Sequence, residues 1–217
     1  ITGEWTRIIK TGGSRNNALR FFDMNMRSDT TEEFYVFGAQ IEAGDFATSY
    51  ISTGGSSVTR AADVSTTALG VDSFHNQSEG TMFVEALNYA HPNPGTALVP
   101  LSYSDNSFTN LIQLGGSTGS NVFNFDTISS GSQFRATLGN YSSNKLKSAG
   151  AYKITGSAGS LDGATAVTSS PSSIPSTINR LDIGNNHTGT LFINGHIKRF
   201  MYFNTRLSDD KLKSITT

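Results

Sequence analysis

Short runs of hydrophobic residues, separated by polar turns, recur along most of this chain. The runs are rich in Val, Ile, Phe and Tyr, which pack well on a pleated sheet. Gly, Asn, Asp and Ser fill the segments between them, and these residues readily adopt turn conformations. The runs that we expect to form strands are 80–89, 97–103, 110–114, 121–127, 133–138, 145–154, 164–168, 180–183, 190–193 and 196–204. This pattern predicts an all-β fold.

Two dipeptides carry the signal of a tight β-hairpin. Asp162-Gly163 and Asn194-Gly195 each lie between short apolar runs. Asp, Asn and Gly tolerate the positive φ angles that a type I′ turn requires. We therefore expect a two-residue hairpin turn at each position.

One short helix is expected near the C-terminus. Ser208 is a good N-cap residue, and Asp209 and Asp210 would lie in the first turn, where the helix dipole favours negative charge. Lys211 and Lys213 follow. The sequence predicts one or two helical turns here.

The first 52 residues hold three further strand candidates, at 5–9, 18–23 and 34–41. Three strands cannot enclose a sandwich core alone, because a small sheet needs a second layer over its apolar face. We expect the end of a β-sandwich whose start is missing, or a segment that neighbouring chains complete. Residues 53–59 have the Gly/Ser-rich composition of a linker, and 60–217 form the main domain.

The composition excludes some classes of function. Among the 217 residues only 15% are charged, the formal net charge is −1, and no extended basic cluster offers the positive face that nucleic acid binding requires. No run approaches the ~20 apolar residues that span a bilayer. The absence of cysteine favours assembly in a reducing bacterial cytoplasm. Because the chain begins at Ile1, without Met or a signal peptide, we expect it to be part of a longer protein.

Two segments together resemble a junction found in phage tail proteins. The first is Phe37-Gly-Ala-Gln-Ile-Glu-Ala-Gly-Asp-Phe-Ala-Thr-Ser-Tyr-Ile51, and the second is Thr59-Arg-Ala-Ala-Asp-Val64. In that family the junction closes a carbohydrate-binding-module-like β-sandwich. Residues 79–85 and 191–208 are similar to the first core strand and to the closing strand and helical turn of the jelly roll that follows.

The resemblance implies a fold and a setting. The fold is a concanavalin A-like (laminin G-like) jelly-roll β-sandwich, preceded by a partial β-sandwich. The setting is a homotrimeric tail fibre or tailspike in the virion, with a bacterial cell-surface polysaccharide as its target. Neither nucleic acid binding nor membrane insertion is expected.

Two patterns suggest catalysis, and each has a simpler interpretation. Gly115-Gly-Ser-Thr-Gly119 matches the G-x-S-x-G nucleophile elbow, which needs a strand before it and a helix after it. Here a strand candidate follows, so a hairpin loop fits better. Glu79 and Glu85 offer two carboxylates, as glycoside hydrolysis requires. They lack the alternating acidic cluster of concanavalin A-like glycosidases, so a turn residue and a paired strand carboxylate are the favoured interpretation. No catalytic residue is predicted.

Metal binding has one candidate site. The four histidines have no i, i+2 or i, i+4 pairing, so zinc is unsupported. Asp182 and Asn185, together with Asn186, offer the oxygen donors that Ca²⁺ prefers. Asn-rich loops are also common as plain turns, and both interpretations stay open.

Glycan binding needs an aromatic ring for the apolar face of a sugar, with hydrogen-bonding groups nearby. Three loops carry such mixtures, and in each the alternative is a purely structural role. The candidate ligand-binding residues are Tyr89, His91, Asn93, Tyr103, Asp105, Asn186 and His187.

The sequence thus favours a receptor-binding fibre tip that recognises a bacterial surface glycan. A structural trimerisation module without its own ligand is the alternative. A polysaccharide-degrading enzyme is a third hypothesis.

Overall fold

The computed structural model describes residues 7–9, 37–42, 47–61, 63–67, 73–90, 97–141, 145–154 and 156–217, with only the backbone for 88–90. The chain divides into two units, Ile1–Arg60 and Ala61–Thr217, and each is described by itself. No helix in the described ranges is long and apolar enough to cross a membrane.

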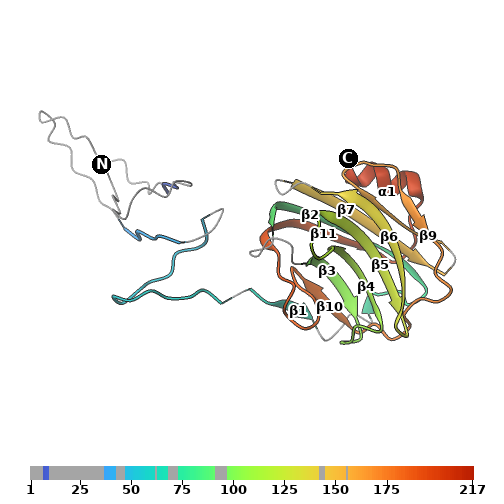
Figure 1. Ribbon diagram of the computed structural model, residues 1–217, viewed down its shortest axis with the longest axis horizontal. Helices are drawn as coiled ribbons and strands as arrows, with labels where there is room; N and C mark the ends of the chain where they lie inside the picture. The colour runs from blue at the N-terminus through green and yellow to red at the C-terminus, as the bar shows by residue number, and fades with distance from the viewer. Residues whose placement is uncertain are drawn as a thin grey trace, which may run out of the picture. The chain divides into compact units, whose positions relative to one another are not determined.

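The second unit is built from two antiparallel sheets (Figure 1). In its described part, one sheet has the strand order β1-β10-β3-β4-β5-β6 and the other β11-β2-β7-β8-β9. The strands are β1 (Ser65–Thr67), β2 (Glu79–Ala90), β3 (Leu98–Ser104), β4 (Leu111–Gly116), β5 (Val122–Ser129), β6 (Ser132–Asn140), β7 (Lys145–Lys153), β8 (Ser157–Leu161), β9 (Val167–Ser169), β10 (Arg180–Ile183) and β11 (Asn194–Phe203). The prediction of an all-β jelly-roll sandwich is confirmed.

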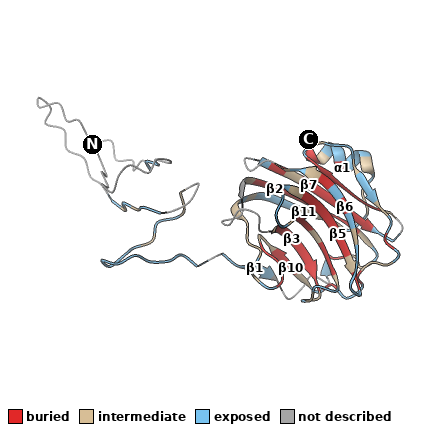
Figure 2. Ribbon diagram, in the orientation of Figure 1, coloured by how far each residue is buried: buried red, intermediate tan, exposed pale blue. Residues whose placement is uncertain are grey.

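The core lies between the two sheets. Successive side chains of a strand point to opposite faces, so Met82 and Val84 of β2 face inward together with Phe123 and Phe125 of β5. Figure 2 shows the buried residues concentrated along the central strands of both sheets. The sheets approach closely at Gly150 of β7, where a Cβ atom would lie 2.1 Å from the Phe125 ring.

The predicted helix is α1 (Asp209–Thr216), and the side chain of its N-cap Ser208 accepts a hydrogen bond from the Lys211 amide. The helix covers part of the outer face of the second sheet. There Leu212 is fully buried in a small cluster with Phe83 and Ala149. The helix therefore gives this face a local core of its own.

The outer face of the first sheet is polar. A row of cross-strand partners runs from Asp182 through Ser102, Gln113 and Asp126 to Arg135. Arg135 forms an ion pair with Asp126 at 2.7 Å, and Asp126 is almost fully buried. These side chains lie opposite the core, and the Asp182 end of the row belongs to the candidate site described below.

Most strand predictions are confirmed within two residues. The strand expected over 164–168 overlaps β9 only at 167–168, and three further features differ from the predictions. The segment 190–193 is not a strand, because the Ile193 amide bonds to the Gly184 carbonyl in a loop. The hairpin expected at Asn194-Gly195 is wrong, since both residues belong to β11, and Asn194 pairs with Ala90 of β2. Strand β8 was not predicted at all.

Two of the turn predictions are confirmed. Asp162 and Gly163 both have positive φ, 46° and 77°, as a type I′ turn requires, and the Ala164 amide donates to the Leu161 carbonyl at 2.9 Å. The Gly115–Gly119 motif ends β4 and enters the turn before β5, so it is a hairpin loop and not a nucleophile elbow.

In the first unit, the strand expected over 34–41 is not formed in its described part, residues 37–41. Gly38 has a φ of 70°, outside the β region, and it lies against the Tyr50 ring. The Gln40 side chain accepts from the Ile51 amide at 2.7 Å. The Glu42 carboxylate accepts from the Thr48 amide at 2.6 Å. Side-chain hydrogen bonds thus replace strand pairing here. The other strand candidates of this unit lie wholly or largely outside the described residues.

Candidate functional site

Two loops that follow inner strands of the first sheet bring an exposed aromatic ring against a histidine. Phe108 lies in the loop between β3 and β4, and His187 lies in the segment after β10. Their ring centroids are 4.2 Å apart in an edge-to-face arrangement, with an interplanar angle of 70°. Phe108 is 58% exposed, whereas His187 is only 8% exposed. His187 therefore supports a ring that faces solvent.

Asp105 anchors the Phe108 loop. Its carboxylate accepts hydrogen bonds from Ser107 at 2.5 Å, from the Asn110 amide group at 2.9 Å and from the Thr177 hydroxyl at 3.3 Å. Burial pushes the pKa of Asp105 upward, but these hydrogen bonds outweigh it and hold the pKa below its usual value. The group is ionised at neutral pH and fixes the loop.

Arg180 joins this loop to the sheet. Its guanidinium donates to both carboxylate oxygens of Asp182, at 2.7–3.0 Å, and to the Asn106 side-chain oxygen at 3.0 Å. Asp182 is fully buried. Because both of its oxygens are engaged by Arg180, Asp182 fits an ion pair better than a calcium ligand. No group of three or more His, Asp or Glu residues in the described segments has the geometry to hold a metal ion.

The two asparagines of the following loop point inward. The Asn186 side-chain oxygen accepts from the Thr190 and Leu191 amides and from the Thr188 hydroxyl, and it thereby closes the loop on itself. Asn185 is almost fully buried, and its amide group has no hydrogen-bond partner within the described part of the chain. Neither side chain meets the expectation of a surface sugar ligand or an open metal ligand, because both are packed beneath the loop.

His187 is held in its neutral form. Burial lowers its pKa, while Asp182 and Asp105 raise it and Arg180 lowers it. Burial is the largest effect. A neutral ring packs against Phe108 without the cost of burying a charge.

Tyr103 belongs to the core and not to the surface. It is 1% exposed, and its ring lies 5.3 Å from that of His75 and 5.5 Å from that of Tyr202. Burial raises its pKa strongly. The structure therefore favours the structural interpretation of Tyr103 over the ligand-binding one. His91 and Asn93, and the side chain of Tyr89, lie outside the described residues.

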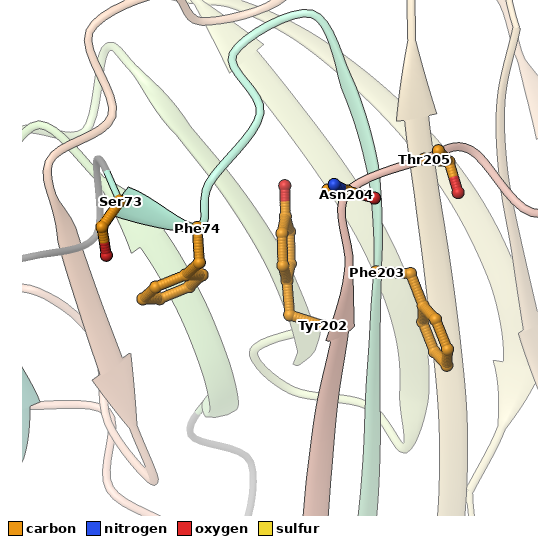
Figure 3. Close-up of a pocket in the computed structure, with 6 residues that line it drawn as sticks. All are labelled: Ser73, Phe74, Tyr202, Phe203, Asn204 and Thr205. Carbon is orange, nitrogen blue, oxygen red and sulfur yellow. The ribbon is translucent and has the colours of Figure 1, made fainter.

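A second place offers a hollow in the surface, of about 480 Å³. It lies where β11 ends and is lined by Ser73, Phe74, Tyr202, Phe203, Asn204 and Thr205 (Figure 3). Phe74 is 42% exposed, and its ring meets that of Tyr202 edge-on, with centroids 5.6 Å apart. The hollow is thus walled by aromatic rings and rimmed by polar side chains.

Tyr202 is fixed by hydrogen bonds. Its hydroxyl accepts from the Asn76 amide at 2.8 Å and lies 2.8 Å from the Tyr152 hydroxyl. Tyr152 in turn donates to the Asn76 carbonyl at 2.6 Å. The ring that supports Phe74 is therefore held by hydrogen bonds, whereas the His187 ring that supports Phe108 is held by burial.

Glu79 and Glu85 are poorly placed for glycoside hydrolysis. They lie six residues apart on β2, roughly 20 Å along the strand, whereas catalytic carboxylate pairs are about 5–9.5 Å apart. The Arg206 amide lowers the pKa of Glu79, and Lys198 lowers that of Glu85. Neither carboxyl group is a proton donor at neutral pH. Glu85 is a strand carboxylate paired with Lys198 and Arg199, as expected.

Both exposed rings were missed by sequence reasoning. Phe108 and Phe74 are single aromatic residues within otherwise polar segments, 104–110 and 72–78. An isolated Phe in a polar loop has no strand partner to pack against, and this was the signal that the sequence offered. Of the predicted residues whose side chains the structure describes, Asp105 and His187 are the two that lie beside an exposed aromatic ring.

Comparison with known proteins shows the fold. No family model matches the chain, and no curated protein matches it in sequence. The CBM40 domain of the Ruminococcus gnavus IT-sialidase is similar in structure, with a TM-score of 0.51 and 14% identity over 65% of this chain and 84% of that domain.

Two sialidases contain a similar region. The NanB sialidase of Streptococcus pneumoniae matches with a TM-score of 0.51 and 13% identity over 67% of this chain. The leech intramolecular trans-sialidase matches with a TM-score of 0.52 and 11% identity over 65% of this chain. The chain spans about a quarter of the length of each, 25% and 23%. At these identities the likeness establishes the sandwich fold alone.

Proposed function

We propose that this chain is a non-catalytic glycan-binding module whose binding surface is centred on Phe108. The observation that carries the proposal is the exposed Phe108 ring, held edge-on by the buried His187 ring beside a set of fixed polar groups. An exposed aromatic face in a fixed orientation suits the apolar face of a sugar ring.

The polar groups around Phe108 suit sugar hydroxyls. The Ser107 and Thr109 hydroxyls, 2.9 Å apart, flank the ring on the exposed loop. Towards β10, the Asn106 side-chain oxygen accepts a hydrogen bond from the Arg180 guanidinium. Because these groups are already held by hydrogen bonds, a ligand would meet a preorganised surface, and little freedom would be lost on binding.

The fold supports the proposal at the level of the scaffold. The CBM40 domain named above is a domain of similar size on the same type of sandwich. Since one fold serves many functions, the proposal depends on the Phe108 surface and not on this likeness.

We further propose the setting: the receptor-binding tip of a phage tail fibre or tailspike, assembled as a homotrimer in the virion and directed at a bacterial surface polysaccharide. The support is the resemblance of residues 37–51 and 59–64 to the phage junction. Within the first unit, Arg60 of the second segment donates to the Ser49 carbonyl of the first at 2.7 Å and to its hydroxyl at 2.6 Å.

The test is an array of bacterial capsular and lipopolysaccharide glycans, probed with the full chain and with Phe108→Ala. We expect binding to a small set of glycans and at least a tenfold loss in the variant, which corresponds to about 1.4 kcal/mol. Phe200→Ala is the matched control, because Phe200 is also a partly exposed ring, on β11 of the other sheet. A blank array with folded wild-type protein, or equal binding by Phe108→Ala, contradicts the proposal.

A further inference from the structure

We infer that the hollow beside Phe74 is a second sugar subsite, so that the ligand is an oligosaccharide chain lying across one end of the sandwich and not a single terminal sugar. This inference rests on the proposed glycan-binding function. It assigns the hollow a ligand and defines the ligand by its length.

The two places are built alike. Phe108 and Phe74 are each partly exposed, and each meets a second ring edge-on. That ring is the buried His187 in one case and the hydrogen-bonded Tyr202 in the other. Exposed aromatic rings are costly to leave in water. In both places the supporting ring fixes the orientation in which the exposed face meets a ligand.

The hollow also offers hydrogen-bonding groups. The backbone carbonyls of Asn204 and Thr205 accept from Asn76 and Thr81, which fixes this segment. Their side chains line the hollow together with Ser73, as Figure 3 shows. Phe203 points to the opposite side from Tyr202 in the same view, so Phe74 and Tyr202 form the aromatic wall. The aromatic wall suits the apolar face of a pyranose, and the amide and hydroxyl groups suit its hydroxyl groups.

Both places lie at the same end of the sandwich. The Phe108 loop follows the end of β3, and the hollow lies where β11 ends and β2 begins. Gln77 connects them, because its side chain donates to the Ile178 carbonyl at 2.7 Å and accepts from the Ile178 amide at 3.2 Å. The neighbouring Thr177 bonds to Asp105, which anchors the Phe108 loop.

This chain of hydrogen bonds links the segments that carry the two rings. Phe108 lies on a loop of the first sheet, and Phe74 packs on Tyr202 of a strand of the second. Because packed sheets are roughly 10 Å apart, we expect the two rings to be separated by about that distance. A single sugar ring cannot contact both at such a spacing, whereas an oligosaccharide can. Binding at two linked places raises the overall affinity well above that of either.

The experiment uses fluorine NMR of the full chain labelled with 4-fluorophenylalanine. The signals of Phe74 and Phe108 are assigned by their loss in Phe74→Leu and Phe108→Leu. The probes are disaccharide and hexasaccharide pools prepared by partial hydrolysis of a panel of bacterial capsular polysaccharides. We expect a hexasaccharide pool to shift both signals along one binding curve, at least about tenfold tighter than the matching disaccharides.

The variants separate the two subsites. Phe74→Leu should lose most of the affinity that the hexasaccharide gains over the disaccharide, while disaccharide binding at Phe108 persists. The control is Val167→Ala, at an exposed apolar position on the edge strand β9. It should change neither the hexasaccharide nor the disaccharide affinity. A shift of the Phe108 signal alone overturns the inference and leaves the proposed function standing. A shift of the Phe74 signal alone, or of neither signal, overturns both.

Discussion

At the residue scale, burial decides which polar and aromatic side chains are available to a ligand. The sequence pointed to Tyr103, Asn186 and His187 for their chemistry, and all three are buried. Residue type indicates what a side chain can do, but only the packing of the loops determines where it points. Phe108, an ordinary core residue by type, is left exposed.

His187 makes the Phe108 site sensitive to pH. Burial lowers its pKa below 6.5, so the unfolded chain binds more protons than the folded one once the pH falls through 6.5. The stability that the neutral ring contributes is therefore present above pH 6.5 and is lost on acidification. Asp105 and Asp182 face the ring and oppose this effect, whereas Arg180 adds to it.

We expect urea unfolding between pH 7 and pH 5 to show a decrease in the free energy of unfolding that is smaller in His187→Gln. Over the same range the wild-type chain should also lose affinity for its glycan. Identical pH dependence in the two proteins would show that His187 does not titrate as described.

At the element scale, strands with strong hydrophobic patterns were predictable and weakly hydrophobic ones were not. β2, with its run of large apolar residues, was found from the sequence almost to its ends. β8 consists of Ser, Ala, Gly, Ser and Leu, yet all five residues are buried. Their burial depends on pairing with β7 and β9 and on contact with Phe125 and Leu138, which local sequence does not reveal.

The close approach of the sheets gives a stability prediction. Gly150→Ala would place a methyl group 2.1 Å from the Phe125 ring, so the ring or the strand must move. Overpacking of this kind costs about 1–3 kcal/mol. We expect a loss of that size in the free energy of unfolding, measured by chemical denaturation.

Gly156→Ala is the matched control for that substitution, because a Cβ atom at Gly156 meets nothing within 4 Å. It should leave the free energy of unfolding nearly unchanged. Equal effects of the two substitutions would indicate that the contact between β7 and β5 is looser than described.

At the scale of the whole molecule, the sequence predicted the architecture better than the site. Hydrophobic periodicity and turn residues suffice for a two-sheet sandwich, since each strand needs only one buried face. The site needs two loops from distant parts of the chain to meet, at Phe108 and His187. No local pattern encodes that meeting, so the sequence alone could propose Asp105 and His187 separately but not together.

The proposed setting predicts an oligomer. If the chain is part of a trimeric fibre, light scattering coupled to size exclusion should give three times the mass of one chain. Removal of residues 1–60 should test whether the first unit is needed for assembly. A stable monomer of the full chain would leave the glycan-binding proposal intact and would remove the support for the fibre.

The central claim is that a sugar binds on the Phe108 surface. The most direct test is a crystal structure of the chain with the glycan that binds most strongly on the array. We predict a sugar ring stacked on Phe108, with hydroxyls bonded to the Asn106, Ser107 or Arg180 side chains. A sugar bound elsewhere, for example on the exposed Lys198 and Arg199 side chains of β11, with Phe108 uncovered, would contradict the account.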